Sequence, residues 1–387
     1  MKLDKSQLAA IEYATDGGKL RIITGGAGTG KTTIIKAIMQ RIKGQGDLLA
    51  PTGKAAQRLR EATGLDAQTI HRWLKWTGDT IERAEPTAAP VIIDEASMVD
   101  AWLLARVLQF AIGPVILVGD AAQLAPVGAG QPFRDILAAY PGNVARLTTC
   151  HRATAAINVA AISIRGGKLP AIRDLKSGGE RFAVLETGDL EETAAWLVEM
   201  VKATDYDPDV DMVICAKNET RRRLNAELAA VINPRTGTEP FRAGDRVMNL
   251  KNNAALDWYN GDAGWIHDID TAGRPWVIID RGPNTDRSGA DAVKLERDAA
   301  RDITLAYAIT VHKSQGSQAR RVYFAATAAD SFLLDRSLVY TAVTRGRESV
   351  FVVGHPAAIA GAINRTAGKR TALQYQIAKK TAEHVPL

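Results

Sequence analysis

The stretch GGAGTGKT, residues 25–32, decides the fold. It follows the apolar run LRIIT (20–24) and precedes the helical pattern of TIIKAIMQRI (33–42). A glycine-rich loop between a buried strand and a helix is the context that the phosphate-loop pattern requires. The loop amides would hold phosphate oxygens at the helix N-terminus, and the lysine would reach the β- and γ-phosphates. We therefore expect a nucleoside triphosphate site here.

The phosphate loop supplies most of the expected nucleotide contacts. Lys31 is assigned to the β- and γ-phosphates, and the hydroxyl of Thr32 to Mg²⁺. The alternative is a glycine-rich turn that binds nothing, which the flanking strand and helix disfavour. The assigned contacts are Gly25, Gly26, Ala27, Gly28, Thr29, Gly30, Lys31, Thr32 and Thr33.

Two carboxylates follow another apolar run in VIIDEAS, residues 91–97. An Asp-Glu pair after a strand is usually a solvated helix cap, but a phosphate loop in the same chain favours a catalytic role. Asp94 is expected to hold Mg²⁺, and Glu95 to orient and deprotonate the attacking water. The two motifs together predict an NTPase.

Composition narrows the class of protein without naming a partner. The chain has 387 residues, 46% of them hydrophobic, which predicts a globular protein of two or three domains. The sequence has no apolar run near the ~20 residues that span a bilayer, and its N-terminal MKLDKSQLAAIEYA lacks an apolar signal region. Cys150 and Cys215 have neither metal nor redox spacing, so we expect a cytoplasmic protein. A net charge of +6 is compatible with a polyanionic partner.

Short apolar runs alternate with helical patterns along most of the chain, which predicts an α/β fold with parallel sheets. The strands expected in the first half are LRIIT (20–24), DLLAP (47–51), VIIDE (91–95), PVILVGD (114–120) and ARLT (145–148). Those expected in the second half are FAVLE (182–186), MVICA (212–216), ITLAYAIT (303–310), VYFAA (322–326) and VFVVG (350–354). Residues 241–299 contain short strands between Asn-Gly and Gly-Pro breaks, which predicts a small inserted β-barrel. A helical tail is expected over 355–387.

Polar loops elsewhere carry groups that are suited to phosphoryl transfer. Gln123, in LVGDAAQLAPVGAGQPF (117–133), is placed to hydrogen-bond a γ-phosphate. Arg152 in TTCHR and Arg345 in SLVYTAVTRGR supply guanidinium groups that can stabilise the charge of the transition state. For either arginine alone, a surface ion pair is the better interpretation.

Taken in order, these stretches resemble the helicase motifs of superfamily 1, and most closely those of the RecD/Dda branch, which moves 5′→3′ on single-stranded DNA. The matching stretches, within residues 3–347, are LDKSQ, GGAGTGKT, APTGKAA, TIHRWL, VIIDEASM, GDAAQLAPVGAG, LTTCHR, YAITVHKSQGSQ and YTAVTRGR. The resemblance implies two RecA-like P-loop NTPase domains with ATP in the cleft between them, and an SH3-like inserted barrel. The implied domains are 1–153 with a short insertion at about 75–89, then 154–240 with 300–387, and the barrel at 241–299.

The resemblance adds nucleotide contacts on the second domain, where the HKSQGS loop lies at the cleft in the family. Gly316 and Gln318 are the matching positions. The family ends this motif in Glu, and an amide accepts a hydrogen bond less strongly than a carboxylate. Gln318 therefore predicts weaker nucleotide affinity or a looser sugar preference. Gln7 matches the residue that recognises adenine, although Asp4 and Gln7 also fit a capping box of the first helix; we favour adenine recognition.

DNA contacts are expected on both domains. Thr52 and Lys54 follow a strand in APTGKAA and are placed to hold phosphates near a helix N-terminus. His71 matches a residue that can stack on a base, and its alternative is a helix-start histidine without a ligand. The matching candidates on the second domain are Thr310, His312 and Ser314.

Relatives insert a strand-separating hairpin, or pin, between TIHRWL and VIIDEASM. Here only HRWLKWTGDTIERAEPTAAP is available, in which KWTGDTIE predicts a short hairpin around Thr77-Gly78-Asp79 with Trp76 near its base. We therefore expect secure translocation and less efficient unwinding. Three aromatic residues of the inserted barrel form either its core, which we favour, or a face against DNA: Trp258, Tyr259 and Trp265.

The sequence as a whole predicts an ATP- and Mg²⁺-dependent single-stranded DNA translocase and 5′→3′ DNA helicase that hydrolyses ATP to ADP and phosphate. Its expected partners are single-stranded and forked duplex DNA, with replication or recombination proteins as further candidates. We expect it to act as a monomer and away from membranes. One alternative is a DNA-stimulated ATPase that remodels protein–DNA complexes with little unwinding, which the short pin favours. Another is a nucleotide-switched module that binds DNA or RNA.

Overall fold

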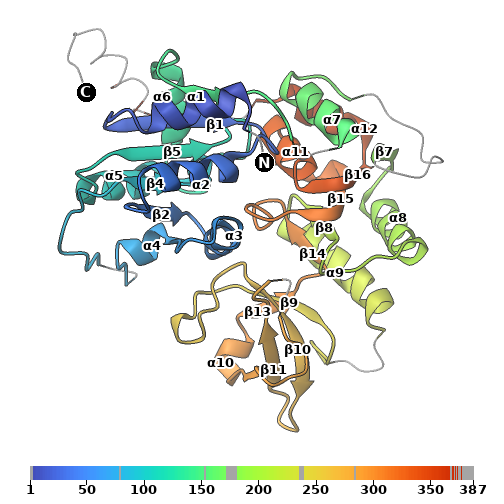
Figure 1. Cartoon of the computed structure of the whole chain (residues 1–387). Coiled ribbons are helices and arrows are strands. Elements are labelled where there is room, and N and C mark those ends of the chain that lie inside the picture. The colour runs from blue at the N-terminus through green and yellow to red at the C-terminus, as the bar shows by residue number, and fades with distance from the viewer. Residues whose placement is uncertain are drawn as a thin grey trace. The chain divides into compact units, whose positions relative to one another are not determined.

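The chain forms two compact units. The computed structural model describes residues 3–77, 80–151, 154–170, 181–234, 239–282, 285–366, 368–369, 371, 373 and 376. Unit 1 consists of Met1–Gly166, Arg336–Thr344 and Thr366–Leu387, and unit 2 of Gly167–Asp335 and Arg345–Arg365. Each unit is built around its own parallel sheet (Figure 1), as the alternation of apolar runs and helical patterns predicts.

Six strands form the sheet of unit 1: β1 Leu20–Gly25, β2 Asp47–Ala50, β3 Gln68–Thr69, β4 Val91–Ile93, β5 Val115–Gly119 and β6 Ala145–Leu147. Their order is β3-β2-β4-β5-β1-β6, and every neighbouring pair is parallel. The central strands β4 and β5 are buried along their whole length, as expected for strands that are covered on both faces. Strand β3 was not predicted, because two residues are too few to show a periodic pattern.

Helices pack on both faces of this sheet: α1 Lys5–Ala14, α2 Lys31–Arg41, α3 Gly53–Thr63, α4 Ile70–Trp73, α5 Ala101–Phe110 and α6 Pro132–Ala139. The unit also contains α7 Ala155–Arg165 and α11 Arg336–Val343. A 3₁₀ turn, η1 Ala96–Met98, follows β4. Alternate residues of one strand point to opposite faces. Accordingly Val91 and Ile93 pack with α5 and α6 in one core cluster, and Ile92 packs with α1, α2 and α3 in another.

The parallel sheet of unit 2 consists of β7 Arg181–Glu186, β8 Met212–Cys215, β14 Ala308–Thr310, β15 Ala319–Ala326 and β16 Gly346–Gly354. Its order is β14-β8-β15-β16-β7. The described helices of this unit are α8 Leu190–Ala203, α9 Asn218–Ile232, α10 Arg297–Ala300 and α12 Pro356–Asn364, with 3₁₀ turns η2 Ala254–Leu256 and η3 Ala328–Asp330. Helices α8 and α9 bury Leu197 and Leu224 against this sheet. Helix α12 begins the predicted helical tail, and most residues after Thr366 lie outside the described part of the chain.

An antiparallel sheet in unit 2 corresponds to the predicted inserted barrel. Its strands are β9 Arg246–Asn249, β10 Ala263–Ile269, β11 Pro275–Ile279, β12 Val293–Lys294 and β13 Ile303–Leu305, in the order β12-β11-β10-β9-β13. Trp258 is buried in its core, as favoured. Trp265 is half-buried, with the guanidinium groups of Arg246 and Arg287 at 4.7 and 4.2 Å from its ring centre. Tyr259 is half-buried too.

One predicted strand is wrong. The run ITLAYAIT was expected to be a single strand of the second α/β domain, but it contributes β13 to the antiparallel sheet and β14 to the parallel sheet. Between them, Ala306 N donates to Arg246 O at 2.9 Å, and the buried Tyr307 donates its hydroxyl proton to Asp245 Oδ1 at 3.0 Å. An unbroken apolar run suits burial in either sheet, so its pattern does not reveal where the chain changes sheet.

The compact units and the predicted domains divide the chain at different residues. Helices α7 and α11 belong to unit 1 and pack against each other. The predicted boundaries at residues 153 and 300 assigned both helices to the second domain. The division into RecA-like domains at those boundaries stays a prediction.

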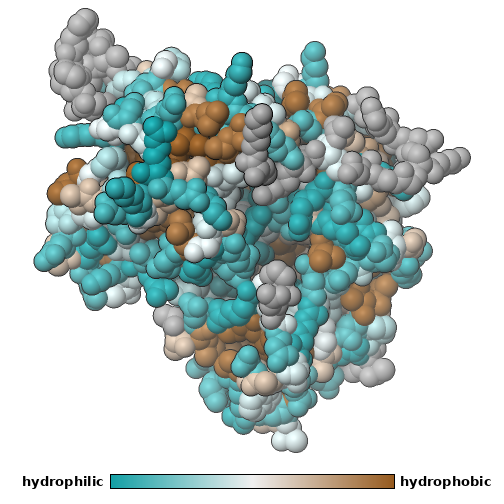
Figure 2. Space-filling view, viewed as in Figure 1, coloured by the Kyte–Doolittle hydropathy of each residue, from teal (hydrophilic) through white to brown (hydrophobic). Residues whose placement is uncertain are grey.

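The surface is largely hydrophilic. Figure 2 shows hydrophilic side chains over most of the face in view, with separate apolar patches among them. Single exposed apolar residues are normal on a protein surface. Of the helices that the structure describes, none combines the length and the apolarity that crossing a membrane requires.

Candidate nucleotide and nucleic-acid site

The phosphate loop lies between β1 and α2, as predicted. Gly28 and Gly30 have φ angles of 78° and 84°, in the left-handed region that favours glycine, and Gly30 is the N-cap of α2. A Cβ atom on Gly25 would lie 2.5 Å from Thr29 Oγ1 and 2.8 Å from Leu147 Cβ. These glycines let the backbone turn tightly into the helix N-terminus, where free amides and the helix dipole favour an anion.

Lys31 is held against the loop backbone. Its Nζ donates to the carbonyl oxygens of Gly25 and Gly26, each at 2.9 Å. These are neutral acceptors, and a phosphate oxygen would replace them with a stronger, charge-assisted bond. The side chains of Thr32 and Thr33 are half-buried on the first turn of α2.

The two predicted catalytic carboxylates follow β4 in the same parallel sheet in which β1 leads to the phosphate loop. Burial and the negative charge of Glu95 raise the pKa of Asp94 to about 7, and the positive charges of Lys31 and Arg58 oppose this rise. Asp94 therefore lies within electrostatic reach of the phosphate-loop lysine.

Glu95 combines backbone strain with an unsatisfied carboxylate. Its φ angle is 51°, in the left-handed region that a residue with a side chain rarely occupies, at a cost of about 1–3 kcal/mol. Its backbone amide donates to Asp94 Oδ1 at 2.9 Å. Its Oε2 atom is buried and accepts no hydrogen bond from any residue that the structure describes. Strain and an unsatisfied carboxylate together are typical of a functional group rather than of a helix cap.

The residues around the phosphate loop fit a Mg²⁺ ion. This ion is usually bound through one or two carboxylates and completes its octahedron with water and substrate phosphates. Asp94 and the hydroxyl of Thr32 are the protein groups that would hold it. Within the described ranges, no three His, Cys, Asp or Glu side chains are grouped so as to hold a metal.

Gln7 fills the alternative role that its sequence context offered. Asp4 accepts from Gln7 N, and Gln7 Oε1 accepts from Asp4 N at 3.1 Å, so the capping box of α1 is formed. Gln7 Nε2 donates to the carbonyl oxygen of Thr29 in the phosphate loop at 3.2 Å. The side chain is 1% exposed. The capping box is therefore confirmed, and adenine recognition by Gln7 stays a prediction.

Gln123 lies in a buried network after β5. Its Nε2 is 3.4 Å from Asp120 Oδ2, which also accepts from the hydroxyl of Tyr340 on α11 at 2.9 Å. A Cβ on Gly26 would lie 3.3 Å from that hydroxyl. Thr341, also on α11, accepts from Leu124 N at 3.0 Å. The loop that carries Gln123 is thus attached to α11, and Tyr340 reaches the phosphate loop.

The predicted nucleotide contacts of unit 2 lie in the HKSQGS loop (312–317) or directly after it. Gly316 has a φ angle of 75°, and Gln318 is half-buried. Arg345 is buried rather than at the surface, and it donates to Ser317 O at 3.1 Å. Arg152 lies outside the described residues.

The DNA candidates of the same loop differ in exposure. His312 presents surface to solvent, while partial burial of its ring lowers its pKa and the negative charge of Asp335 opposes this. Thr310 and Ser314 are buried, and Ser314 donates its hydroxyl proton to Val311 O at 2.8 Å. The neighbouring Lys313 donates to Asn260 Oδ1 in the Asn-Gly turn of the inserted sheet. Of the three candidates, His312 is the one that presents its side chain to solvent.

The DNA candidates of unit 1 include a helix cap and an aromatic pair. Thr52 is the N-cap of α3 and accepts from Ala55 N at 3.2 Å, and Lys54 is half-buried in the first turn. His71 and Trp76 are stacked, with ring centres 4.7 Å apart. A bridge between Trp76 and Ile81 confirms the base of the predicted hairpin, whose tip at Gly78-Asp79 lies outside the described residues.

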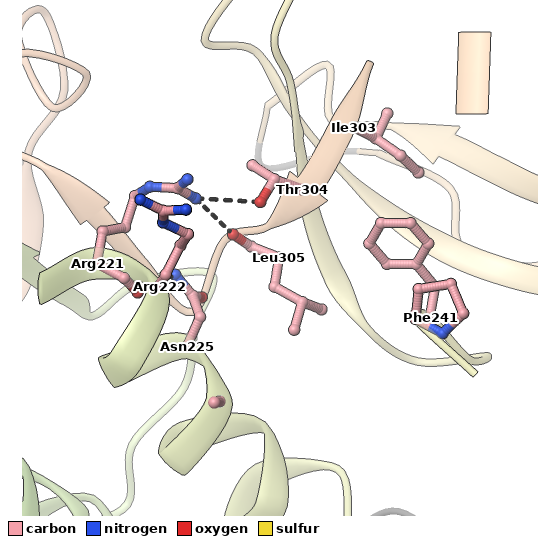
Figure 3. A pocket seen from close by; sticks show the side chains of 9 residues that line it. Arg221, Arg222, Asn225, Phe241, Ile303, Thr304 and Leu305 are labelled. Carbon is pink, nitrogen blue, oxygen red and sulfur yellow. Dashed lines mark hydrogen bonds between the residues drawn. The ribbon is translucent and has the colours of Figure 1, made fainter. Parts of the chain in front are cut away.

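A pocket of about 250 Å³ lies elsewhere in unit 2, between α9 and β13. In Figure 3, Arg221 and Arg222 extend from α9 toward β13, and Arg221 donates to Thr304 Oγ1 at 3.1 Å and Leu305 O at 3.4 Å. Phe241 lies on the side of the pocket opposite Arg221 and Arg222. The pocket is lined by none of the predicted nucleotide or DNA contacts, and Arg221 serves to attach β13 to α9.

Three domain families match the sequence. They are the AAA domain over residues 2–182, the ATP-dependent RecD-like DNA helicase SH3 domain over 224–279 and the UvrD-like helicase C-terminal domain over 305–353. The RecBCD enzyme subunit RecD of Mycolicibacterium smegmatis is 32% identical over 430 residues, which cover 96% of this chain and 75% of that protein. The chain belongs to the RecD-like family of ATP-dependent DNA helicases. The ATP-dependent RecD2 DNA helicase of Deinococcus radiodurans is 34% identical, and the match covers 97% of this RecD-like helicase and 52% of that protein.

Solved structures with this fold include Pif1 helicases. One is Pif1 from Bacteroides in complex with ADP-AlF3 and single-stranded DNA, with a TM-score of 0.60 and 21% identity over 99% of this chain and 98% of that chain. Another is Pif1 from Candida albicans, with a TM-score of 0.58 and 17% identity over 100% of both chains. These likenesses confirm the predicted fold of a RecD-like helicase, two parallel sheets with an inserted SH3-like domain.

Three residues around the sites of this RecD-like helicase were not predicted. Asp120 and Tyr340 lie within quoted motifs, GDAAQ and VYTAVTR, but no local pattern indicated that they bond to each other across more than two hundred positions. Trp102 follows VIIDEASMVDA, and its ring centre lies 4.9 Å from that of Trp76. A tryptophan in an amphipathic helix is ordinarily a core residue, so its position in the sequence does not mark it as a site residue.

Proposed function

We propose that this RecD-like helicase translocates 5′→3′ along single-stranded DNA and separates forked duplexes, with hydrolysis of Mg²⁺-bound ATP as the energy source. The observation that supports the chemical step best is the pairing in unit 1 of the phosphate loop with Asp94 and Glu95. The positive charge of Lys31 opposes the rise in the pKa of Asp94. The Oε2 atom of Glu95 is buried and accepts no hydrogen bond from the described residues. An ATP hydrolase needs this combination of phosphate cradle and base.

Each predicted catalytic residue has a role in the proposed reaction. Lys31 neutralises the β- and γ-phosphates, and Thr32 with Asp94 holds Mg²⁺, which supplies charge neutralisation of the phosphates when bound. Glu95 orients the water that attacks the γ-phosphorus and accepts its proton. The other proposed groups are Gln123, which bonds the γ-phosphate, and Arg152 and Arg345, which stabilise the charge of the transition state.

The proposed DNA contacts are Thr52, Lys54, His71 and Trp76 of unit 1 and His312 of unit 2. Thr310 and Ser314 are proposed to shape the HKSQGS loop, because their side chains are buried. Single-stranded and forked DNA are the proposed substrates. The RecD relative from Mycolicibacterium smegmatis is a subunit of the RecBCD enzyme. For this chain we propose action as a monomer.

A translocase with little unwinding is the second candidate function. The described hairpin is closed by the Trp76–Ile81 bridge and by Thr77 N donating to Thr80 O at 3.1 Å, so few residues extend beyond its base. A short pin offers little surface on which to divide a duplex. A forked duplex with one labelled strand distinguishes the candidates, since remodelling alone leaves the labelled strand annealed.

Displacement of streptavidin from biotinylated oligonucleotides tests the proposed direction. With ATP and Mg²⁺, we expect fast displacement from the 3′ end of a single strand and none above the spontaneous rate from the 5′ end. Faster displacement from the 5′ end would reverse the proposed polarity. Equal, ATP-independent displacement from both ends would instead favour a nucleotide-switched binding module.

A further inference from the structure

Three aromatic rings form a continuous cluster on unit 1. The rings of His71 and Trp76 stack at 4.7 Å with planes inclined by 15°, and Trp76 meets Trp102 at 4.9 Å with planes inclined by 44°. His71 belongs to α4, Trp76 to the hairpin and Trp102 to the first turn of α5. Together they connect a predicted DNA contact, the base of the pin and helix α5, which begins six residues after Glu95.

The backbone around the cluster is fixed. Trp76 N donates to His71 O at 2.9 Å, and the hairpin is closed further by Glu82 N donating to Lys75 O at 3.2 Å. The hairpin residue Ile81 packs against the core of the unit. On the other side, Asp100 caps α5 by accepting from Leu103 N at 2.8 Å. The rings are therefore held in place before any ligand binds, which reduces the entropy lost on binding.

Trp102 is the exposed end of the cluster. Its side chain is 42% exposed, whereas His71 and Trp76 are half-buried beneath it. Elsewhere in the same unit, Trp73 is buried, donates its indole proton to Asp47 Oδ2 at 2.9 Å and is covered by the guanidinium of Arg83. Trp73 is thus a satisfied core residue, and Trp102 offers aromatic surface to solvent.

A cation borders the exposed ring, and two more are exposed on the segment that leads to Trp76. The guanidinium of Arg106 lies 5.3 Å from the ring centre of Trp102, and Arg72 and Lys75 are exposed on the segment that carries Trp76. The acidic groups nearby are Asp100, whose side chain caps α5, and the exposed Glu82. Burial lowers the pKa of His71, and the negative charge of Asp100 opposes this. Aromatic rings bordered by cations suit a base with its adjoining phosphates.

We propose that the exposed ring of Trp102, backed by Trp76 and flanked by Arg106, binds an unpaired nucleobase of single-stranded DNA by stacking. The proposal rests on the proposed function, since it adds a base-binding site to the DNA track of unit 1. Stacking is tolerant of sequence, because every base has an aromatic face. The site therefore gives grip without sequence preference, which a translocase requires.

Binding of two strands with the same phosphates tests this site. The strands are oligo-dT and an abasic deoxyribose-phosphate strand of equal length, and the measured quantity is the ratio of their Kd values. In the parent protein oligo-dT should bind more tightly. In Trp102→Leu, which keeps apolar cover over Trp76 but lacks an aromatic face, the preference should fall about 5- to 150-fold. Trp102→Tyr should retain most of it.

Trp196→Leu is the matched control, because Trp196 is 46% exposed on α8 and makes no ring contact with the described residues. It should keep the parental Kd ratio. A parental ratio in Trp102→Leu would overturn the stacking site. Equal weakening in Trp102→Leu and Trp102→Tyr would also overturn it, because Trp102 would then act by holding the hairpin. Failure of the parent protein to bind oligo-dT would instead overturn the proposed function itself.

Discussion

Lys31→Ala should lower the rate of ATP hydrolysis by roughly 10³-fold, the scale on which loss of one donor or positive charge at a transferring phosphoryl group acts. Among the described residues, the ammonium bonds to the carbonyl oxygens of Gly25 and Gly26 in its own loop. Loss of these two bonds costs the fold about 1 kcal/mol each, so the variant should still be folded. Steady-state phosphate release with saturating oligo-dT measures the effect.

Lys36→Ala is the matched control for this variant. Lys36 lies on the exposed face of the same helix, and its removal changes the net charge by the same amount. It should hydrolyse ATP at the parental rate. Parental activity in Lys31→Ala would mean that the phosphate loop is not the catalytic site.

Glu95→Gln should reduce hydrolysis by about 10²- to 10⁴-fold, the range that a positioned general base contributes. The amide has nearly the same shape, yet it cannot accept the proton of the attacking water. The strained backbone and the unsatisfied Oε2 atom of Glu95 indicate that its carboxylate is placed for chemistry rather than for stability. Nucleotide affinity should remain close to parental, because Lys31 and Asp94 are unchanged.

Two measurements separate the base role from a binding role. A fluorescent ATP analogue reports the Kd, and a single-turnover assay reports the rate of the chemical step. Glu85→Gln, at an exposed position of the same unit, removes one negative charge without touching the site and should leave both values parental. A Glu95→Gln protein that hydrolyses ATP at the parental rate, or that fails only because it no longer binds nucleotide, would contradict the role of Glu95 as the base.

The phosphate loop and the parallel strands were predictable because short-range patterns determine them. Strands buried on both faces are continuous apolar runs. Gly30 is a glycine because the turn from β1 into α2 requires a positive φ angle at that position. The run ITLAYAIT shows the limit of such patterns. Both of its halves are apolar, and only the pairing partners, Asn249 for Ile303 and Val213 for Ala308, divide it between two sheets.

The predicted sites depended on long-range contacts that the sequence does not show. Gln7 completes its own helix cap, as its local pattern predicts, but the sequence does not show its bond to Thr29 of the phosphate loop. Ser314 lies in a motif expected to touch DNA, yet its hydroxyl is used inside the loop. Conversely, Trp102 resembles a core tryptophan until the structure places it beside Trp76 with an exposed face.

Steady-state ATP hydrolysis with and without oligo-dT, at low and at moderate salt, tests the central claim that this RecD-like helicase couples ATP hydrolysis to movement on single-stranded DNA. We expect strong stimulation by oligo-dT that weakens as salt rises, because DNA phosphates bound by lysine and arginine release counterions. Equal rates with and without oligo-dT at both salt concentrations would contradict it.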